Sequence, residues 1–523
     1  MIKRELFYYS IIVLLIFFSI FTSSNLGYSW DEFYHFINGA LRWKFIESFG
    51  SFKDYYFRDN KYYPGFYDTF SYAIGAQLNK YFNLNTEVID HSINYFFSFF
   101  SLVGIFQILK KFFNKEIALI SVVFCFINPF FFGHMAINGK DTIISFSFIW
   151  FHYAIIKYFL NFQNSRFKYL ILASLFLGLG MGVRVAFFIL ILPTLIIFVF
   201  WLAKNQKENF KIFIKKIFLD ILIFFSLSIF IVISCWPHLF DHNIISFLKD
   251  LIVNTIIWPG AIPTGIINGI SYETSETPRL YFFYFFIYRM PIFFIVLFII
   301  GIYLLIDKKA FINQNIFNID KKFNFILVIF FFPILLSALL QTKLYDGIRL
   351  FLFLIPIFSF ICAIAFYFII NKFRKKFLSI FFLIFLFIFF ISFSYRFISI
   401  APYQYSYVNN FFSLKESHNK FENDYWGTSF KELILKVSKL KDLEKNKLKI
   451  TVCGGNVKIV AHYLNEYMNI KTIYKKNIAN YIIMTNRAEG STTCFNKFSG
   501  EDLASVERSG MILSVFRKIN LSN

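Results

Sequence analysis

Two adjacent carboxylates, Asp31 and Glu32, follow the first long apolar segment of the chain, in the string Ser-Trp-Asp-Glu-Phe-Tyr-His that ends at His35. Carboxylates at the mouth of a membrane bundle cost free energy to desolvate, so they usually line a water-filled cavity or a substrate path. Such a group can take a proton from a hydroxyl, which makes Asp31 and Glu32 candidates for acid–base chemistry. The competing interpretation is structural, because an aspartate at the start of a helix is a common N-cap.

Three further polar clusters interrupt the apolar background and supply mainly cations. They contain Lys140 with Asp141; Arg184; and Lys343, Tyr345 and Arg349. Carboxylates together with cations are what a site needs to hold a phosphate and deprotonate a hydroxyl. Plainer interpretations exist: a salt bridge between Lys140 and Asp141, a snorkelling anchor at Arg349, and a helix end at Arg184. The sequence alone does not establish that the clusters converge.

The composition places the chain in a lipid bilayer. Of its 523 residues, 57% are hydrophobic and only 16% are charged, and the mean hydropathy is +0.58. These three values lie outside the range of ordinary soluble domains. The formal net charge of +22 would suggest a nucleic-acid partner in a soluble protein. Here the Lys and Arg residues lie mainly in short loops between apolar runs, so they indicate membrane topology and no nucleic-acid binding.

Eleven apolar runs are long enough to cross a membrane as helices. They lie at 6–24, 88–109, 117–133, 142–160, 169–183, 185–203, 217–236, 288–306, 325–340, 350–370 and 377–398. The expected fold class is therefore mainly α, a polytopic membrane protein with about eleven transmembrane helices. The runs at 169–183 and 185–203 are short and nearly contiguous, so a re-entrant pair is an alternative there.

The basic residues concentrate in alternate loops, all on one side of the predicted membrane domain. They are Lys3, Arg4, Lys110, Lys111, Lys115, Arg166, Lys168, Lys204, Lys207, Lys211, Lys215, Lys216, Lys308, Lys309, Lys321, Lys322, Lys372, Arg374, Lys375 and Lys376. The positive-inside rule then predicts a cytoplasmic N-terminus and a C-terminal region outside the membrane. No small-residue cleavage site follows the first run, so we expect an uncleaved span rather than a signal peptide.

Residues 1–398 are expected to form the membrane domain, and 399–523 an exported region with a small α/β domain. In the first outer loop, 25–87, apolar residues recur every four positions from Phe33 to Phe45, which predicts a short amphipathic helix at the membrane interface. The sequence pattern of the exported region predicts a strand at 449–454, a helix at 457–467, and strands at 481–485 and 511–517. Cys453 and Cys494 both fall there and would form a disulfide in an oxidising compartment.

The arrangement of these motifs resembles the C-type glycosyltransferases, in the bacterial branch akin to protein O-mannosyltransferases and the lipid A aminoarabinose transferase. The resemblance rests on the Trp-Asp-Glu string of the first outer loop, the Lys-Asp pair at 140–141 and the Tyr-Asp-Gly-x-Arg loop at 345–349. Further likeness lies in Trp236-Pro237 and in the strings at 402–409 and 421–432. These two strings would line an acceptor groove or, as the plainer interpretation, pack the small domain onto the bundle.

The resemblance implies an inverting glycosyltransferase of the bacterial inner membrane that moves a sugar from a polyprenyl-phosphate donor to an acceptor hydroxyl or similar group on the periplasmic or outer face. It makes Asp31 the candidate base. Glu32 and Asp141 would orient the acceptor, tune the base or bind a cation. The candidate substrate-binding residues are Lys140, Arg184, Lys343, Tyr345, Arg349 and His35, of which the cations would stabilise the phosphate leaving group.

Several properties stay open at this level. A divalent cation serves in some relatives of the family, but no clear metal-ligand set is evident in this sequence. The acceptor could be a protein, lipid A, a glycan or a lipid, and neither the sugar nor the oligomeric state is indicated. Two other functions are compatible with the sequence: a glycan ligase or polymerase, and a transporter of a lipid-linked substrate. Transporters usually carry their charges near the membrane midplane, whereas these charges cluster at the outer ends of spans, which favours the enzyme.

Overall fold

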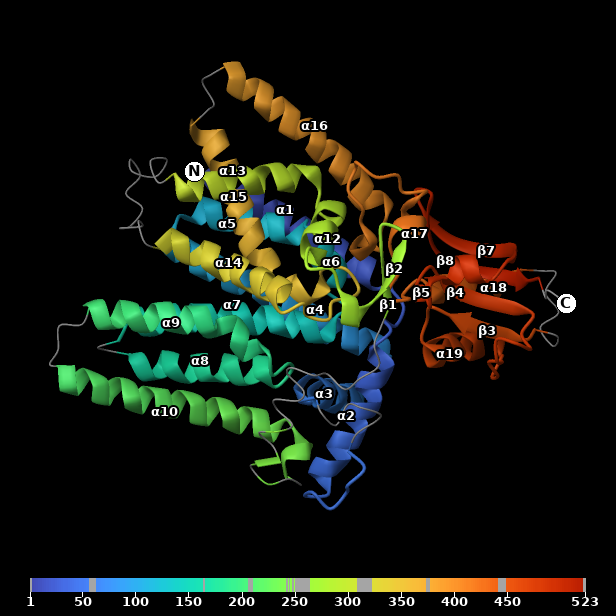
Figure 1. Cartoon of the computed structure of the whole chain (residues 1–523), viewed down its shortest axis with the longest axis horizontal. Helices are drawn as coiled ribbons and strands as arrows, with labels where there is room; N and C mark the ends of the chain where they lie inside the picture. Colours follow the sequence, from blue (N-terminus) through green and yellow to red (C-terminus); the bar gives the residue numbers. More distant parts are fainter. Residues whose placement is uncertain are drawn as a thin grey trace.

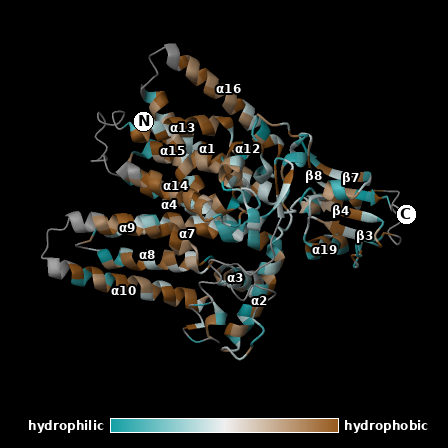
Figure 2. Cartoon of the chain, in the orientation of Figure 1, coloured by the Kyte–Doolittle hydropathy of each residue, from teal (hydrophilic) through white to brown (hydrophobic). Residues whose placement is uncertain are grey.

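The computed structural model describes residues 2–55, 63–162, 165–205, 210–240, 264–307, 322–372, 377–440 and 448–520, with four single positions between 243 and 249. Within these residues a bundle of long helices leads into a small α/β domain at the C-terminal end (Figure 1). Brown, hydrophobic residues dominate the bundle, and teal, hydrophilic residues gather in the small domain and at its junction with the bundle (Figure 2).

Each of the eleven predicted spans contains a helix. The bundle helices are α1 (Ile2–Ser23), α4 (Thr86–Phe112), α5 (Lys115–Phe126), α6 (Pro129–His134), α7 (Gly139–Leu160), α8 (Arg166–Met181), α9 (Phe187–Asn205), α10 (Phe210–Ser234), α13 (Ile292–Ile306), α14 (Lys322–Leu339), α15 (Ile355–Lys372) and α16 (Phe377–Ser399). Within the described ranges, six stretches are long and apolar enough to span a membrane, and three shorter apolar helices accompany them. The expected fold class, a mainly α polytopic membrane protein, is confirmed.

The predicted span at 117–133 is interrupted. Helix α5 ends at Phe126, and α6 starts at Pro129, a residue that cannot donate the backbone hydrogen bond needed inside a helix but fits the first turn. The side chain of Asn128 caps α6 by accepting hydrogen bonds from the backbone N–H groups of Phe130 and Phe131. The chain can therefore change direction at the C-terminal end of α5, just before the Lys140 cluster.

The first outer loop forms two helices, α2 (Glu32–Glu47) and α3 (Phe66–Phe82), which pack against each other. The sequence predicted α2 but not α3. The buried face of α2 is its polar one, with Glu32, His35, Asn38 and Arg42 enclosed by the protein. The apolar residues that predicted the helix are mostly only half-buried. The charges on the buried face are tolerated because each has an ionic partner, as described below.

The elements of the outer region are short. They are the 3-10 helices η2 (Pro237–Phe240), η3 (Thr274–Glu276), η5 (Arg349–Leu354) and η6 (Gln404–Ser406), the antiparallel hairpin of β1 (Thr264–Ile267) and β2 (Ile270–Glu273), and the helices α12 (Tyr281–Arg289) and α17 (Ser417–Lys420). The hairpin of β1 and β2, α12 and α17 lie on the side of the bundle that faces the C-terminal domain (Figure 1), whereas η2 packs against α10.

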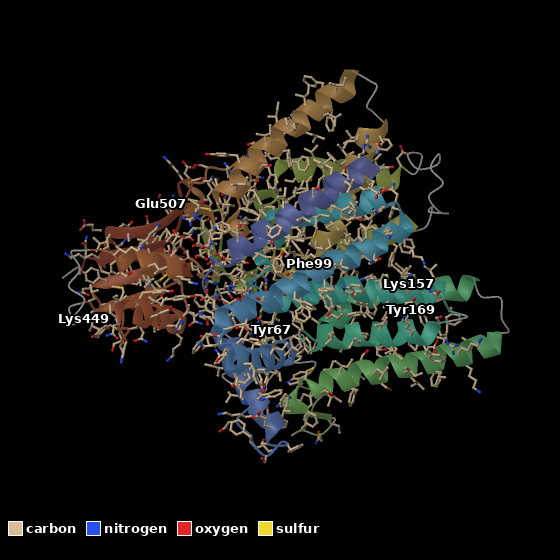
Figure 3. All side chains as sticks on the ribbon, turned by 180° about the vertical axis from the view of Figure 1, so that it is seen from behind. Tyr67, Phe99, Lys157, Tyr169, Lys449 and Glu507 are labelled. Atoms are coloured by element: carbon tan, nitrogen blue, oxygen red, sulfur yellow. A yellow bond between two sulfur atoms is a disulfide. The ribbon has the colours of Figure 1, made fainter. Side chains whose placement is uncertain are left out.

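The two ends of the bundle differ in what they carry. The C-terminal ends of α7, α9, α13 and α15 lie at one end of the bundle, while α2, α3 and the C-terminal domain lie at the other (Figure 1). In the view from behind, Lys157 and Tyr169 lie in the part of the bundle remote from the small domain that holds Lys449 and Glu507 (Figure 3). Some basic residues of the topology prediction lie outside the described residues: Lys207, Lys308, Lys309, Lys321, Arg374, Lys375 and Lys376.

The C-terminal domain is built on a four-stranded sheet of order β3-β4-β8-β7. Its elements are α18 (Phe430–Val437), β3 (Ile450–Cys453), α19 (Val457–Met468), β4 (Tyr481–Thr485), β5 (Ala488–Glu489), β6 (Thr492–Thr493), α20 (Cys494–Lys497), β7 (Gly500–Arg508) and β8 (Met511–Ile519). Strands β3 and β4 are parallel, whereas β8 pairs antiparallel with β4 and β7. The predicted strand–helix–strand–strand order is present, and β7 is an additional strand.

The segment leaving the bundle joins the two parts tightly. Tyr403, Tyr405 and Tyr407 are all buried. The Tyr405 hydroxyl donates to the Asp424 carboxylate, which also accepts backbone N–H groups from 427 to 429. From the bundle side, Arg289 donates to the carbonyl oxygens of Tyr407 and Glu422. These contacts pack the domain onto the bundle.

Candidate active site

Asp31 forms an ion pair at the end of the bundle that carries α2 and α3. It occupies the N-cap position of α2 with helical backbone angles, and its side chain makes no capping hydrogen bond. Its Oδ2 instead lies 3.5 Å from Nη1 of Arg349, and 37% of the side chain is exposed. The side chain of Asp31 therefore does not cap the helix. Its carboxylate is accessible beside the Arg349 cation.

The electrostatic surroundings keep Asp31 ionised. Burial by itself would raise the pKa of this carboxyl, but the charges of Arg349, His35 and Lys140 outweigh that effect and leave the pKa below its ordinary value. A carboxylate with a lowered pKa is deprotonated at neutral pH and free to accept a hydrogen bond from a hydroxyl group.

Arg349 is held by an acidic residue and two aromatic rings. Its Nη2 lies 3.0 Å from Oδ2 of Asp346, and its guanidinium stacks 4.7 Å from the centre of Tyr345 and 4.6 Å from that of Trp426. Its Nε–H is buried and finds no hydrogen-bond acceptor among the described residues, and the indole N–H of Trp426 is in the same state. Buried donors without acceptors are costly unless an anion or water meets them.

The loop before Arg349 has an uncommon backbone. Asp346 and Gly347 both have positive φ angles, 55° and 69°, a conformation that aspartate and glycine adopt more readily than most residues. The tight turn allows the carboxylate of Asp346 to contact Arg349 three positions later. The Tyr-Asp-Gly-x-Arg string is therefore a turn that positions the arginine at the start of η5.

Asp141 and Arg184 pair at the N-terminus of α7. The side chain of Asn138 caps this helix and donates to Asp141 Oδ2, while Arg184 Nη2 donates to Asp141 Oδ1 at 2.8 Å. The partner of Asp141 is therefore Arg184 rather than Lys140. Lys140 lies with its ammonium 4.8 Å from the ring centre of Tyr63. The Nε–H of Arg184 is buried without an acceptor among the residues that the structure describes.

The side chain of Tyr63 lies close to charged residues from several segments of the chain. Burial raises the pKa of its hydroxyl well above the ordinary value, and the charges of Arg184, Asp31 and Arg349 all act on it. Tyr345 is also close enough to raise that pKa. The structure thus brings Asp31, Lys140, Arg184, Tyr345 and Arg349 together from four separate segments of the chain, with Asp141 attached through Arg184.

Glu32 does not share the environment of its neighbour. It is 2% exposed, its Oε2 accepts the backbone N–H of Ser29, and its Oε1 lies 3.3 Å from His91 Nε2. Its partners are in the bundle, so the structure does not bring it into the Arg349 cluster. A role in orienting the acceptor stays a prediction.

His35 lies in a second buried group beneath α2. Its Nδ1 is 2.8 Å from Oδ1 of Asp68, and Arg42 Nη1 lies 2.7 Å from Oδ2 of the same carboxylate. Burial would raise the pKa of Asp68, but His35 and Arg42 lower it to about 2. The contacts of His35 and Arg42 with Asp68 fix α2 on α3.

Lys343 lies in the same loop as Tyr345. Its contact with substrate, which the sequence suggested, is likewise still a prediction.

The sequence did not single out Arg487, Asp346, Asp68 and Trp426 as site residues. Asp346 belongs to the string that suggested Arg349, and Trp426 to the string at 421–432, so both lay within recognised motifs. Arg487 follows β4 in the C-terminal domain, where no motif marked it, yet its Nη2 contacts Oδ1 of Asp346 at 3.0 Å. Only the folded arrangement brings it to the site.

Cys453 and Cys494 are joined by a disulfide that links β3 to the start of α20. Among the described residues, one group of three side chains has its ligand atoms close enough to hold a metal ion: these two cysteines and Glu489. Disulfide sulfurs are not thiolate ligands, so this group does not fit a cation. At Asp31 the neighbouring charges are cationic, which also disfavours a divalent ion there.

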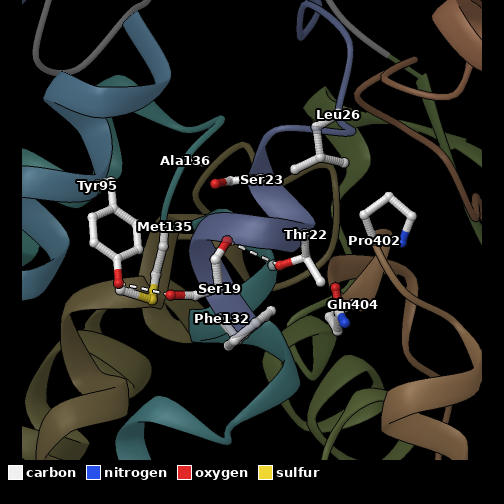
Figure 4. A pocket seen from close by; sticks show the side chains of 11 residues that line it. Ser19, Thr22, Ser23, Leu26, Tyr95, Phe132, Met135, Ala136, Pro402 and Gln404 are labelled. Atoms are coloured by element: carbon white, nitrogen blue, oxygen red, sulfur yellow. Dashed lines mark hydrogen bonds between the residues drawn. The ribbon is translucent and has the colours of Figure 1, made fainter. Parts of the chain in front are cut away.

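A small cavity lies apart from the charged cluster, at the C-terminal end of α1. Its lining includes Ser19, Thr22, Tyr95, Met135 and Gln404 (Figure 4). The Ser19 hydroxyl bonds to that of Tyr95. The enclosed volume is about 10 Å³, room for about one water molecule. A cavity of this size does not accommodate a sugar.

Comparison with known families matches the middle of the chain. Residues 93–236, from α4 through α10, match the family described as dolichyl-phosphate-mannose-protein mannosyltransferase. The matched part includes Lys140, Asp141 and Arg184 but not Asp31 or Arg349. A comparison with curated proteins found no match.

Solved structures similar to this chain include two of ArnT from Cupriavidus metallidurans. The apo structure aligns at 12% identity over 68% of this chain and 59% of the other, with a TM-score of 0.42. The structure bound to undecaprenyl phosphate aligns at 10% identity over 97% of both chains, with a TM-score of 0.47.

The fold and the charged cluster define a polytopic membrane protein with an ionised carboxylate and several cations at one end of its helix bundle. With the family match over α4 to α10, the chain resembles the C-type glycosyltransferases akin to protein O-mannosyltransferases. The match supports a glycosyltransferase in general terms.

Proposed function

We propose that the protein is an inverting glycosyltransferase that moves a sugar from a polyprenyl phosphate to an acceptor hydroxyl. The observation that carries this proposal is the pairing of the accessible Asp31 carboxylate with Arg349, whose buried Nε–H has no acceptor among the described residues. A base for the acceptor and a donor for the phosphate then lie side by side. These are the two groups that a displacement at a sugar phosphate requires.

In the reaction, the acceptor oxygen attacks the anomeric carbon while the bond from that carbon to the phosphate oxygen breaks. The acceptor proton passes to a carboxylate oxygen of Asp31. The electron pair of the broken bond stays on the phosphate, so polyprenyl phosphate leaves as an anion. One displacement inverts the configuration at the anomeric carbon.

The leaving phosphate needs cations more than it needs an acid, because negative charge develops on it as the bond breaks. Arg349 and Arg184 each present a buried Nε–H to this region, and Lys140 adds a third positive charge close to Asp31. Arginine suits this task because its planar fork can contact two phosphate oxygens at once. Arg184 is in turn oriented by Asp141.

The cluster lies at the end of the bundle that carries α2, α3 and the C-terminal domain. We place this end on the periplasmic or outer face of the bacterial inner membrane, because the sequence predicts that the basic loops lie on the other side. Polyprenyl chains would reach the cluster through the lipid phase, and the acceptor from the aqueous side. Protein, lipid A, glycan and lipid acceptors are all compatible with this geometry.

The test is mass spectrometry of lipid-linked sugars, glycolipids and exported glycoproteins in cells with and without the protein. We expect loss of the protein to accumulate one polyprenyl-phosphate sugar and to remove one glycoconjugate, with both restored by the wild-type chain. Missing chain length on an otherwise complete glycan would point to a polymerase or ligase. If the protein is a transporter, its loss would leave the substrate on the inner leaflet, so the accumulated lipid would be inaccessible from outside.

A further inference from the structure

Arg487 brings a cation of the C-terminal domain to the membrane cluster. Its Nη2 lies 3.0 Å from Oδ1 of Asp346, and its guanidinium stacks 4.7 Å from the ring centre of Trp30. Only 13% of the side chain is exposed. Trp30 immediately precedes Asp31, so the arginine contacts both the loop of the candidate base and the loop of Arg349.

The contact completes a row of alternating charges. Asp346 offers one carboxylate oxygen to Arg487 and the other to Arg349, each at 3.0 Å. Arg349 in turn lies 3.5 Å from Asp31. Asp346 is shared between Arg349 and Arg487, so its single negative charge neutralises Arg349 only in part. The remaining positive charge of Arg349 can act on Asp31 and on an incoming phosphate.

The segment around Arg487 is fixed in place. Its carbonyl oxygen accepts the N–H of Cys494, a member of the disulfide, and the next residue, Ala488, donates its N–H to Glu422. Asn486 bonds through its side chain to the carbonyl oxygens of His418 and Phe421. The side chain of Arg487 is therefore presented from a rigid part of the domain.

A second carboxyl, Glu422, competes only weakly for Arg487. Its Oε1 lies 3.9 Å from Nε of Arg487. Burial raises the pKa of Glu422 to about 7; Arg487 opposes the rise and Asp346 favours it. Glu422 is therefore ionised less readily than an ordinary carboxyl and lies farther from Arg487 than Asp346 does, so Asp346 is the main ionic partner of Arg487.

We infer that Arg487 is a positioning residue for the transfer site, acting through Asp346 to leave Arg349 available to Asp31 and to the phosphate of the donor. The C-terminal domain thereby contributes to the membrane site rather than only covering it. The inference rests on the proposed function for the phosphate. Its geometric part, the support of the Arg349 loop by the domain, can be tested without it.

The experiment measures the binding of undecaprenyl phosphate to the full-length chain in lipid nanodiscs. We expect Arg487→Gln to weaken binding by about tenfold, and Arg487→Lys, which keeps the charge, by no more than about threefold. Arg517→Gln is the matched control. It removes a similarly buried arginine of the same domain, 14% exposed and paired with Asp502, and we expect an effect below about twofold.

A double-mutant cycle separates positioning from general support of the fold. If Arg487 acts through Asp346, adding Arg487→Gln to Asp346→Asn should weaken binding by less than about twofold beyond the single change. An undiminished effect in that background would overturn the inference. So would equal losses in Arg487→Gln and Arg487→Lys, because the charge would then be irrelevant. Thermal unfolding of each variant checks that the chain is folded.

Hydrogen exchange of residues 343–349 distinguishes failure of the inference from failure of the proposed function. We expect faster exchange there in Arg487→Gln and unchanged exchange in Arg517→Gln. If the wild-type chain does not bind undecaprenyl phosphate, the proposed function fails, and the exchange result alone decides whether Arg487 supports the loop. Unchanged exchange in Arg487→Gln would overturn that support.

Discussion

Asp31 and Glu32 are neighbours in sequence, but their side chains lie in different surroundings. Asp31 contacts Arg349, whereas Glu32 contacts His91 and Ser29 inside the protein. Successive residues at the start of a helix point about 100° apart, so an Asp-Glu pair cannot place both carboxylates on one site. The sequence identified the motif, but which carboxylate faces the cations depends on how α2 packs on α3 and α4.

Asp31 should set the acid limb of the pH profile. Because its pKa is lowered, the base form exists at every pH above that value, and kcat/KM should depend little on Asp31 between about pH 5 and 8. The rate should fall only when the pH drops through the lowered pKa. Arg349→Met removes the largest influence that lowers this pKa, so the acid limb should move to higher pH. The measurement is the pH dependence of transfer with the donor that lipid analysis identifies.

Arg349→Lys should show that the shape of this cation matters and not only its charge. A lysine keeps one positive charge but loses the fork that contacts Asp346 and the flat face that stacks between Tyr345 and Trp426. We expect about tenfold weaker undecaprenyl-phosphate binding. The comparison is with Lys436→Arg, an exposed exchange on α18. Equal binding by Arg349→Lys and the wild type would argue against phosphate contact by the guanidinium.

At the scale of elements, helices of the bundle were predictable because each is an apolar run of sufficient length. The break between α5 and α6 was marked by Asn128-Pro129 and could have been read from the proline. Helix α3 and strand β7 were missed, since neither has the apolar run of a span, and their formation depends on partners distant in sequence. The polar buried face of α2 was also unpredictable, because Arg42 is buried only where Asp68 meets it.

The disulfide should stabilise the segment that carries Arg487. It closes a loop of 41 residues between Cys453 and Cys494, and bridges of this kind typically contribute about 2–4 kcal/mol. Cys453→Ser combined with Cys494→Ser should lower the unfolding temperature of the C-terminal domain and weaken undecaprenyl-phosphate binding. Cys235→Ser, at a free and partly buried cysteine, is the control. An unchanged unfolding temperature in the double variant would contradict this role.

At the scale of the whole molecule, convergence of the charged loops could not be derived from sequence. Asp31, Arg184 and Arg349 are separated by more than 150 positions from one another, and Arg487 lies another 138 positions beyond Arg349. Their meeting depends on how the helices pack. The sequence supplied the candidates because ionisable groups are rare in this apolar chain, but it could not supply their pairing: Asp141 binds Arg184 and not the adjacent Lys140.

The orientation of the molecule in the membrane makes a separate prediction. In a Cys235→Ser background, Asn465→Cys on the exposed side of α19 should react with a membrane-impermeant maleimide added outside the cell. Ser165→Cys, exposed before α8 at the other end of the bundle, should react only after the membrane is permeabilised. The reverse pattern would place the candidate site on the cytoplasmic face.

The most direct test of the account is the activity of Asp31→Asn in cells that lack the native protein. The substitution preserves shape, and the side chain makes no capping bond, so we expect a folded, inserted protein with at least about 100-fold slower transfer. The polyprenyl-phosphate sugar should accumulate as in cells without the protein. Asp502→Asn, at a similarly exposed carboxylate paired with Arg517, should restore the glycoconjugate. Full restoration by Asp31→Asn would contradict the assignment of Asp31 as the base.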